Sequence, residues 1–216
     1  MVYRKLVRRP VSDKPANFSE NIPPLLQQIY LSRGVVSESE ISTELKSLLS
    51  PKLKGLPLAA KLLADAIEAN QRILIVGDFD ADGATSTALG LLAFTAMGAK
   101  HVDFLVPNRF EYGYGLTPEI VFVAAEMQPD IIVTVDNGIS SIEGVAAAKA
   151  LGIQVVVTDH HLPGDELPEA DAIVNPNQPG CDFPSKALAG VGVMFYVLSG
   201  LRNELKQRTW FERQNI

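Results

Sequence analysis

The stretch that decides the fold is residues 73–86, ILIVGDFDADGATS, in which an apolar run leads directly into aspartates at alternate positions. The run ILIV predicts a β-strand buried on both faces. In extended backbone, residues two apart point to the same side and lie about 6–7 Å from each other. Asp78, Asp80 and Asp82 would then repel one another unless something positive lies among them. We therefore expect a cation-binding site directly after this strand.

Beyond this stretch, short apolar runs alternate with alanine-rich amphipathic segments. The expected strands are ILIVG, VDFLVP, IIVTV, QVVVT and AIVNP, with ATSTALGLLAFTAMG, TPEIVFVAAEMQ and SSIEGVAAAKALG among the helices between them. This alternation predicts an α/β fold, a parallel sheet with helices on both faces. The sequence before it has helical patterning in NIPPLLQQIYLSRG, SESEISTELKSLL and GLPLAAKLLADAIEANQ. We expect a helical lead-in over residues 1–70, packed on the core, and an α/β domain over 71–216.

Composition limits the class of protein. The chain has 216 residues, 47% hydrophobic and 20% charged, which is enough to bury a substantial core. Its uncharged runs fall well short of the ~20 apolar residues of a membrane span, and the basic start MVYRKLVRRP lacks a following apolar signal region. The single cysteine, Cys181, excludes an internal disulfide. These features favour a cytoplasmic protein with no membrane attachment.

Acids and histidines fall at the carboxyl ends of three expected strands. Ligands bind outside these ends in open parallel sheets. Asp136 follows IIVTV, and the triplet Asp159-His160-His161 follows QVVVT, so both lie at the same edge as the aspartates after ILIVG. One such aspartate is often only a helix cap, but so many groups on three strand ends indicate a shared site. Oxygen-rich ligands with one or two imidazoles suit Mn²⁺ or Mg²⁺.

Other known motifs fit these residues less well. DFDADG opens like a calcium-binding loop, but its twelfth position, which requires a bidentate Glu, is Leu89. DADGA after an apolar strand resembles the haloacid-dehalogenase phosphatases, yet that alternative leaves His160 and His161 unexplained. A phosphate-binding P-loop needs Gly-Lys-Ser/Thr, which the sequence lacks. A two-metal phosphoesterase uses all of the residues, because two ions about 3.5–4 Å apart can hold a phosphoryl oxygen, activate water and stabilise the leaving oxygen.

Three segments carry a family resemblance. VGDFDADGATS, DNGISS and VVVTDHH resemble the successive motifs of the DHH phosphoesterase superfamily, and VPNRFEYGYGL and NPNQPGCDFPSKALAGVGVMF are similar to segments of its RecJ family. The resemblance implies a 5′→3′ exonuclease on single-stranded DNA, active in DNA repair and recombination, with two Mn²⁺ or Mg²⁺ ions. Helicases or single-strand-binding protein are implied as further partners. That family continues with another Asp motif and a second domain, so we expect a catalytic-domain fragment with weak or no activity alone.

The resemblance also implies roles for individual residues. Asp136 would bridge two ions, Asp78 would be a ligand or a supporting acid, and His161 would hold the scissile phosphate or protonate the leaving oxygen. The implied catalytic residues are thus His161, Asp136 and Asp78, and the implied metal ligands are Asp78, Asp80, Asp82, Asp136 and His160.

Substrate contacts are expected in two glycine-containing segments. Arg109, beside Asn108, could bind a phosphate, and Tyr114 could stack on a base, although a purely structural loop explains them too. Gly190 and Gly192 would let backbone approach the substrate, and tight helix–sheet packing explains them equally well.

Two further functions stay open beside the exonuclease. A pI near 5.1 favours a DHH enzyme for small phosphoesters such as an oligoribonucleotide, a cyclic dinucleotide or pyrophosphate. A module that binds a nucleotide without catalysis is the other, and the full set of motif acids argues against it.

Overall fold

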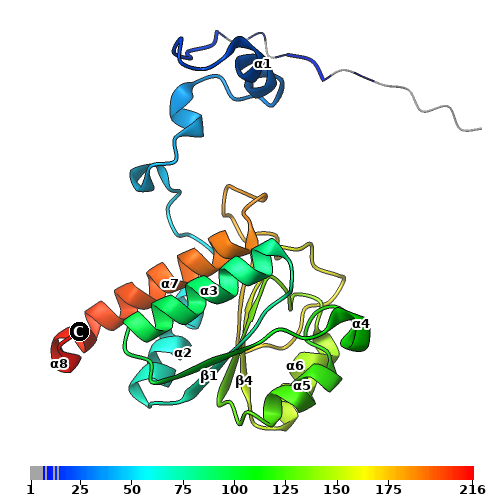
Figure 1. The fold of residues 1–216 in the computed structure, drawn as a ribbon, viewed down its shortest axis with the longest axis vertical. Coiled ribbons are helices and arrows are strands. Elements are labelled where there is room, and N and C mark those ends of the chain that lie inside the picture. Colours follow the sequence, from blue (N-terminus) through cyan, green and yellow to red (C-terminus); the bar gives the residue numbers. More distant parts are fainter. Residues whose placement is uncertain (1–6, 8, 12, 14) are drawn as a thin grey trace, which may run out of the picture. The chain divides into compact units, whose positions relative to one another are not determined.

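The structure is a computed structural model that describes residues 7, 9–11, 13 and 15–216, and the side chain of Arg109 lies outside the described part (Figure 1). The chain divides into two compact units, Met1–Ser50 and Pro51–Ile216. The expected division at residue 70, with the lead-in packed on the core, stays a prediction.

The described residues of the first unit form one α-helix and two short 3₁₀-helices. These are α1 (Pro24–Ser32), η1 (Glu38–Ile41) and η2 (Leu45–Ser47). The single helix expected over SESEISTELKSLL is wrong. The Glu40 carboxylate accepts hydrogen bonds from the backbone N–H groups of Val36 and Ser37, which closes a tight turn, and the backbone is extended again at Ser42. All residues of both 3₁₀-helices are at least partly exposed, so a longer helix would gain little from packing, the main source of helix stability.

The second unit is built on a five-stranded parallel sheet in the order β2-β1-β3-β4-β5. This confirms the predicted α/β fold. This strand order places β1 beside β3, the central strand of the sheet, and β3 is buried at every position. The strands are β1 (Arg72–Val76), β2 (His101–Leu105), β3 (Ile131–Val135), β4 (Gln154–Thr158) and β5 (Ala172–Val174).

One strand departs from the expected burial. The run VDFLVP was expected to be covered on both faces, but β2 lies at the edge of the sheet with only β1 beside it. Its side chains are all at least partly exposed, and Phe104 retains 48% of its accessible surface. An edge strand has a neighbour on one side only, so apolar composition alone does not ensure burial.

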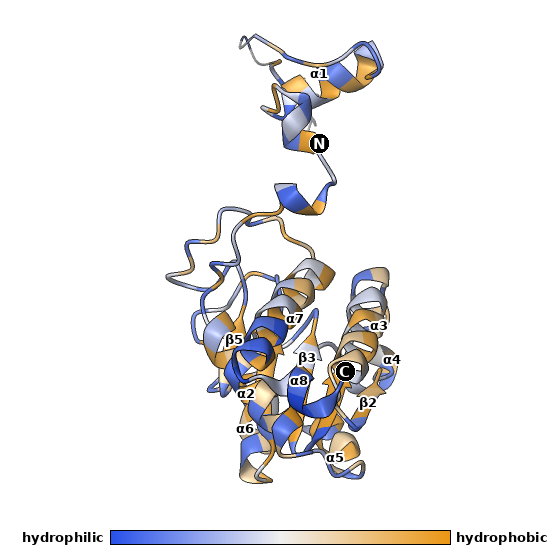
Figure 2. Ribbon diagram, turned by 90° about the vertical axis from the view of Figure 1, so that its left-hand side faces the viewer, coloured by the Kyte–Doolittle hydropathy of each residue, from blue (hydrophilic) through white to orange (hydrophobic). Residues whose placement is uncertain are grey.

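Helices cover both faces of the sheet. In Figure 1, α3 and α7 lie side by side on one face with α2, and α5 and α6 lie on the other. Ile73 and Ile75 of β1 join the core under the first group, whereas Leu74 and Val76 join the core under the second, as alternation along a strand requires. Figure 2 shows hydrophobic residues along the strands between these layers. The helices are α2 (Leu56–Glu68), α3 (Ala81–Ala96), α4 (Arg109–Tyr112), α5 (Pro118–Ala125), α6 (Ile142–Ala150), α7 (Gly190–Gln207) and α8 (Trp210–Gln214).

An ionic cluster connects the end of α7 to α2. The Arg208 guanidinium lies 2.6 Å from Asp65, 2.8 Å from Glu68 and 2.8 Å from Glu204, and Arg213 pairs with Glu68 as well. Burial opposes the charge on Arg208, but the hydrogen bonds from these carboxylates raise its pKa above the ordinary value. The bonds from Arg208 and Arg213 lower the pKa of Glu68. We call this group the α7–α2 ion cluster.

Within the described part of the chain, none of the helices has the length and apolarity needed to cross a membrane.

Candidate metal centre at the carboxyl ends of the strands

The aspartates after β1 lie in a turn and a helix start, not in extended backbone. β1 ends at Val76 and α3 begins at Ala81, so the expected strand-like spacing is wrong. The cause is helix capping: Asp80 Oδ1 accepts hydrogen bonds from the backbone N–H groups of Asp82 at 3.0 Å and Gly83 at 2.9 Å. Asp78 is buried at 8% exposure. The turn still holds all of the predicted acids at the carboxyl end of β1.

The turn after β3 brings a buried carboxylate beside them. Asp136 has a left-handed backbone, with φ of 62°, which aspartate tolerates better than most residues. Its neighbour Asn137 donates hydrogen bonds from Nδ2 to the carbonyls of Val76 at 3.2 Å and Val135 at 2.9 Å. That side chain therefore connects the ends of β1 and β3. Asp136 itself is 2% exposed.

The triplet after β4 is organised by its first residue. Asp159 Oδ1 accepts hydrogen bonds from the backbone N–H groups of His160 at 2.7 Å and His161 at 3.1 Å, and it lies 2.8 Å from His161 Nδ1. Its Oδ2 accepts from the Ile139 N–H at 2.9 Å. Burial would raise the pKa of Asp159, but these bonds together lower it. The bond to Asp159 raises the pKa of the His161 imidazole.

The side chains from these three turns converge on Asp136. His160 Nε2 lies 3.0 Å from Asp136 Oδ1 and 3.6 Å from Asp82 Oδ2. Among the described residues, two groups of three side chains each have ligand atoms that lie within 4.8 Å of one another, and both groups contain Asp136. The first group is Asp136, His160 and His161, and the second is Asp78, Asp80 and Asp136.

The electrostatics of this cluster favour an added cation. Burial, followed by the charges of Asp82 and Asp80, raises the pKa of Asp136 to about 7. Its Oδ1 contacts the His160 ring without hydrogen-bond geometry, and it accepts no hydrogen bond from any group in the described part of the chain. A buried carboxylate oxygen left in this way is stabilised by a metal ion. The donor set, carboxylates with imidazole, suits Mn²⁺ or Mg²⁺.

The start of α7 completes the cluster. Asp82 accepts hydrogen bonds from the backbone N–H groups of Gly190 and Val191, each at 2.8 Å. A Cβ atom added to Gly190 would lie 2.7 Å from Asp136 Oδ1, closer than real Cβ atoms approach. Gly190 therefore contacts the acids, which its predicted role of approaching the substrate did not foresee. A Cβ on Gly192 would instead meet the Leu188 side chain at 2.5 Å. Substrate contacts of either glycine stay predictions.

The predicted substrate loop is described in part. The Tyr114 hydroxyl donates to the Asp136 carbonyl at 2.9 Å and lies 3.1 Å from His161 Nδ1, so this residue is joined to the centre. Asn108 Oδ1 accepts from the Phe110 N–H at 3.1 Å and caps α4. The Arg109 side chain lies outside the described residues. Base stacking by Tyr114 and phosphate contacts by Asn108 and Arg109 stay predictions.

The sequence-based reasoning missed two asparagines that follow β5. The side chains of Asn175 and Asn177 donate to the backbone carbonyls of His161 and His160. The available signal was the segment NPN directly after an apolar strand, which is where the other polar groups of this edge lie.

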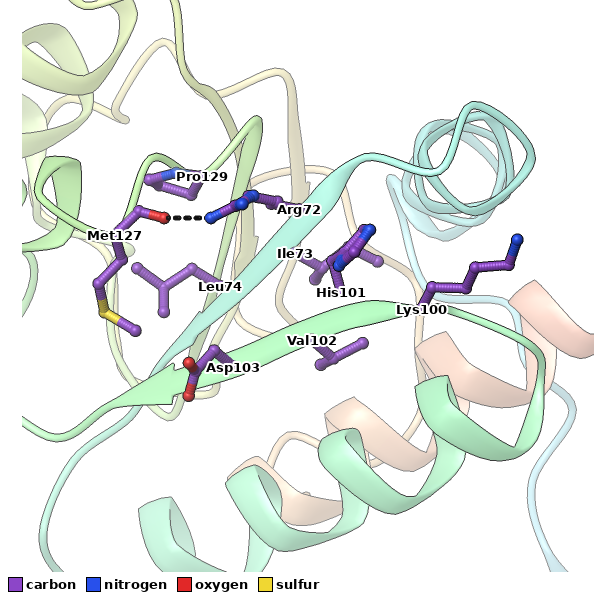
Figure 3. A pocket seen from close by; sticks show the side chains of 9 residues that line it. All are labelled: Arg72, Ile73, Leu74, Lys100, His101, Val102, Asp103, Met127 and Pro129. Carbon is purple, nitrogen blue, oxygen red and sulfur yellow. Dashed lines mark hydrogen bonds between the residues drawn. The ribbon is translucent and has the colours of Figure 1, made fainter.

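A pocket at the opposite, amino end of β1 and β2 has a different lining. It encloses about 280 Å³ and is shown in Figure 3, with Arg72, Lys100, His101 and Asp103 among its side chains. None of the acids or histidines of the candidate centre lines it. His101 is therefore separate from the centre, in agreement with its predicted position away from the carboxyl edge.

Comparison with known proteins decides the family. The family model described as the DHH family, N-terminal domain, matches residues 72–214. The chain belongs to the DHH family. This agrees with the resemblance seen in the motifs, and it removes the haloacid-dehalogenase alternative.

Similar DHH proteins are exonucleases by name. The chain is 52% identical to the single-stranded-DNA-specific exonuclease RecJ of Salmonella typhimurium over 217 residues, and 53% identical to that of Escherichia coli over 211 residues. These matches cover 100% and 97% of the chain but only 38% and 37% of the two relatives. A crystal structure of RecJ from Thermus thermophilus in complex with Mn²⁺ has a TM-score of 0.67 and 32% identity, covering 89% of this chain and 29% of the other.

Proposed function

We propose that this DHH domain is the metal-binding part of a 5′→3′ exonuclease for single-stranded DNA. The observation that carries the proposal is Asp136, a carboxylate at 2% exposure that is shared by both groups of possible ligands. The names of the Salmonella typhimurium and Escherichia coli relatives support the substrate, and the Mn²⁺ complex from Thermus thermophilus supports the metal.

Two divalent ions, Mn²⁺ or Mg²⁺, would be held at this centre. Such ions supply an activated water and stabilise charge on the phosphoryl and leaving oxygens. Asp82 accepts backbone hydrogen bonds through both oxygens, but each oxygen has a further lone pair for a metal. The proposed ligands are Asp78, Asp80, Asp82, Asp136 and His160.

His161 is suited to act on the phosphate. Its side chain is 47% exposed, so it can reach a bound strand, and Asp159 orients it through the 2.8 Å contact at Nδ1. Because that contact raises the pKa of His161, the ring stays protonated to a higher pH than an ordinary histidine does. A protonated imidazole can hold a phosphate oxygen or give its proton to the leaving oxygen. Tyr114, which lies beside the same ring, limits where the imidazole can turn.

The wider proposal includes the strand and the cellular setting. Arg109 and Asn108 would contact the phosphate backbone, with Tyr114 stacking on a base. A cytoplasmic location fits the unpaired, buried Cys181. Helicases or single-strand-binding protein would be its partners in repair and recombination.

A second function is favoured by charge. The chain carries a net charge of −6, whereas surfaces that bind nucleic acid are normally basic. A DHH enzyme for small phosphoesters, such as a dinucleotide or pyrophosphate, needs fewer phosphate contacts.

The test compares four substrates with Mn²⁺ and with chelator. A protein of the relatives' length that carries this sequence, and residues 1–216 alone, would be given 5′-labelled and 3′-labelled single strands, duplex of the same sequence, and a dinucleotide. We expect the longer protein to release mononucleotides from the 5′ end of the single strand only. Residues 1–216 should cleave short substrates slowly at best, because a single strand needs contacts along several nucleotides.

The roles of the two histidines are tested by His161→Ala and His160→Ala in the same preparations, and His161→Ala is considered first. It should lose cleavage while keeping most of its Mn²⁺ affinity, whereas His160→Ala should lose both. Cleavage confined to the dinucleotide would favour the second function, and Mn²⁺ binding without hydrolysis of any substrate would indicate a binding module.

A further inference from the structure

The segment that follows β5 contacts the backbone of both histidines. Asn177 Nδ2 donates to the His160 carbonyl at 2.6 Å, and Asn175 Nδ2 donates to the His161 carbonyl at 3.0 Å. Each asparagine therefore serves one histidine.

The two asparagines are themselves held in place. Asn175 is fully buried, and its Oδ1 accepts the Asn177 N–H at 2.7 Å. Asn177 also donates to the Lys186 carbonyl at 3.2 Å. The Lys186 ammonium then donates to the carbonyls of Pro176 at 2.6 Å and Cys181 at 2.7 Å. Because each amide is fixed by its own neighbours, it can hold a histidine carbonyl at a defined point.

The histidine backbone is thus held from both sides. Asp159 accepts the N–H groups of His160 and His161, and the two asparagines bind their carbonyls. These backbone contacts fix the point from which each imidazole extends. Rotation about the side-chain bonds then sets the ring direction; the contact of Nδ1 with Asp159 limits it for His161, and His160 Nε2 lies 3.0 Å from Asp136.

We propose that Asn177 and Asn175 are positioning residues, Asn177 for the metal contact of His160 and Asn175 for the phosphate contact of His161. The metal part and the phosphate part both rest on the proposed function. Groups that orient a metal ligand without touching the metal typically change metal affinity about 10–100-fold when they are removed. We expect an effect at the lower end of that range for Asn177, about tenfold, because Asp159 still holds the amide side of His160.

The experiment uses Asn177→Ala, because Asn177 is only partly buried and the change adds no charge. Asn203→Ala, at an exposed position of α7, is the matched control. The first readout is the nitrogen–proton NMR signal of each imidazole in the metal-free chain, which has 3 histidines. His101, on β2 and away from the centre, is an internal reference. Asn177→Ala should shift the His160 signals most, those of His161 less, and those of His101 not at all.

The second readout is Mn²⁺ affinity, measured by calorimetry at a temperature where each variant is folded. Asn177→Ala should raise the Kd about tenfold, and Asn203→Ala should leave it unchanged. Unchanged His160 signals together with an unchanged Kd would overturn the proposal. A uniform shift of all three histidines, matched by a lower melting temperature, would also overturn it, since that result indicates general loosening.

Two further outcomes separate this proposal from the proposed function. If wild-type protein binds no Mn²⁺ but the His160 signals still shift, the positioning stands and the metal function fails. If Asn177→Ala does not fold, Asn177→Ser, which keeps a small polar group in the same space, is compared with Asn203→Ser in the same two measurements.

Discussion

The α7–α2 ion cluster and the candidate metal centre both bring carboxylates together, but arginines pair with them in the first, whereas an imidazole lies 3.0 Å from the buried carboxylate of Asp136 in the second. At the ion cluster, Arg208 contacts three acids and Arg213 contacts one of them. At the metal centre, aspartates from two turns meet, and the described side chains nearest to Asp136 bring one imidazole, that of His160, within 3.0 Å. The pKa of Glu68 in the cluster is lowered, whereas that of Asp136 is raised to about 7.

The opposite pKa shifts of Glu68 and Asp136 show that closely spaced carboxylates have different physical roles in one domain. In the ion cluster two guanidinium groups pair with three carboxylates, so most of the charge is compensated within the chain and the interaction contributes to folding whether or not a metal is present. In the metal centre the repulsion is retained because the backbone forces it, through the Asp80 cap and the left-handed Asp136. A metal ion from solution would reduce the repulsion at Asp136. The following predictions test this difference, and those on metal binding run from the largest expected effect to the smallest.

Replacing Asp136 should remove most of the stabilisation by metal. Mn²⁺ at 100 times its Kd should stabilise the wild-type chain by about 2.7 kcal/mol, because it binds only the folded state. Asp136→Asn keeps the left-handed backbone but removes the shared charge, so most of this gain should disappear. Thermal unfolding with Mn²⁺ and with chelator measures it.

The contrasting variant is Arg208→Met, in the ion cluster. It should destabilise the chain by about 1 kcal/mol, since the pairs are partly exposed, and it should leave the Mn²⁺ gain intact. An equal Mn²⁺ gain in Asp136→Asn would remove Asp136 from the metal site and end the comparison.

Adding a methyl group at the start of α7 should lower the Mn²⁺ affinity of the centre, with a smaller effect than the replacement of Asp136. Gly190→Ala would bring a Cβ to 2.7 Å from Asp136 Oδ1, so either α7 or the carboxylate has to move. We expect Mn²⁺ affinity to fall about tenfold, comparable to the removal of an orienting neighbour. Gly164→Ala is the control, since the nearest atom to its Cβ would be the Glu166 carbonyl oxygen at 4.0 Å. If both variants bind Mn²⁺ as tightly as wild type, the contact of Gly190 with Asp136 does not contribute to Mn²⁺ affinity.

The stability of the metal-free chain should also depend on pH, independently of metal binding. Asp136 has a pKa of about 7 when folded and an ordinary, lower pKa when unfolded, so the folded state holds the proton more tightly. Its contribution to stability is therefore present at low pH and is lost as the pH rises from about 4 to about 7. The raised pKa of His161 acts in the same direction at higher pH, and the Asp136→Asn variant separates the two.

Denaturant unfolding between pH 4 and pH 7, with chelator present, measures this difference. Wild type should lose stability relative to Asp136→Asn across that range, and apparent Mn²⁺ affinity should rise over the same range as the proton is displaced. Parallel pH profiles for the two proteins would show that Asp136 titrates normally.

Much of the fold could be predicted because its signals are local. Uninterrupted apolar runs identified β1, β3 and β4, and the polar residues that end them identified the edge where the site lies. The exposure of β2 could not be predicted, because it depends on which strand pairs with which. The helix expected in SESEISTELKSLL failed because Glu40 closes its own turn.

In the candidate site too, predictions could be made from local sequence signals, whereas contacts between distant segments could not be predicted. Asp136, His160 and the acids after β1 follow from their place at strand ends. The contacts of Asp82 with α7, and of Asn177 with His160, depend on segments far apart in the sequence. A glycine or an asparagine in a loop has many ordinary explanations, and only the folded backbone shows which carbonyl or carboxylate it meets.

The distance between Asp82 and Gly190 along the chain also sets an order of events during synthesis. The amide that holds Asp82 is made 108 residues after it, which corresponds to roughly 5–20 s at ribosomal elongation rates. During that interval the growing chain already carries the acids and then both histidines, but not the helix start that fixes Asp82. The centre can therefore become complete only after the first turn of α7 has left the ribosome.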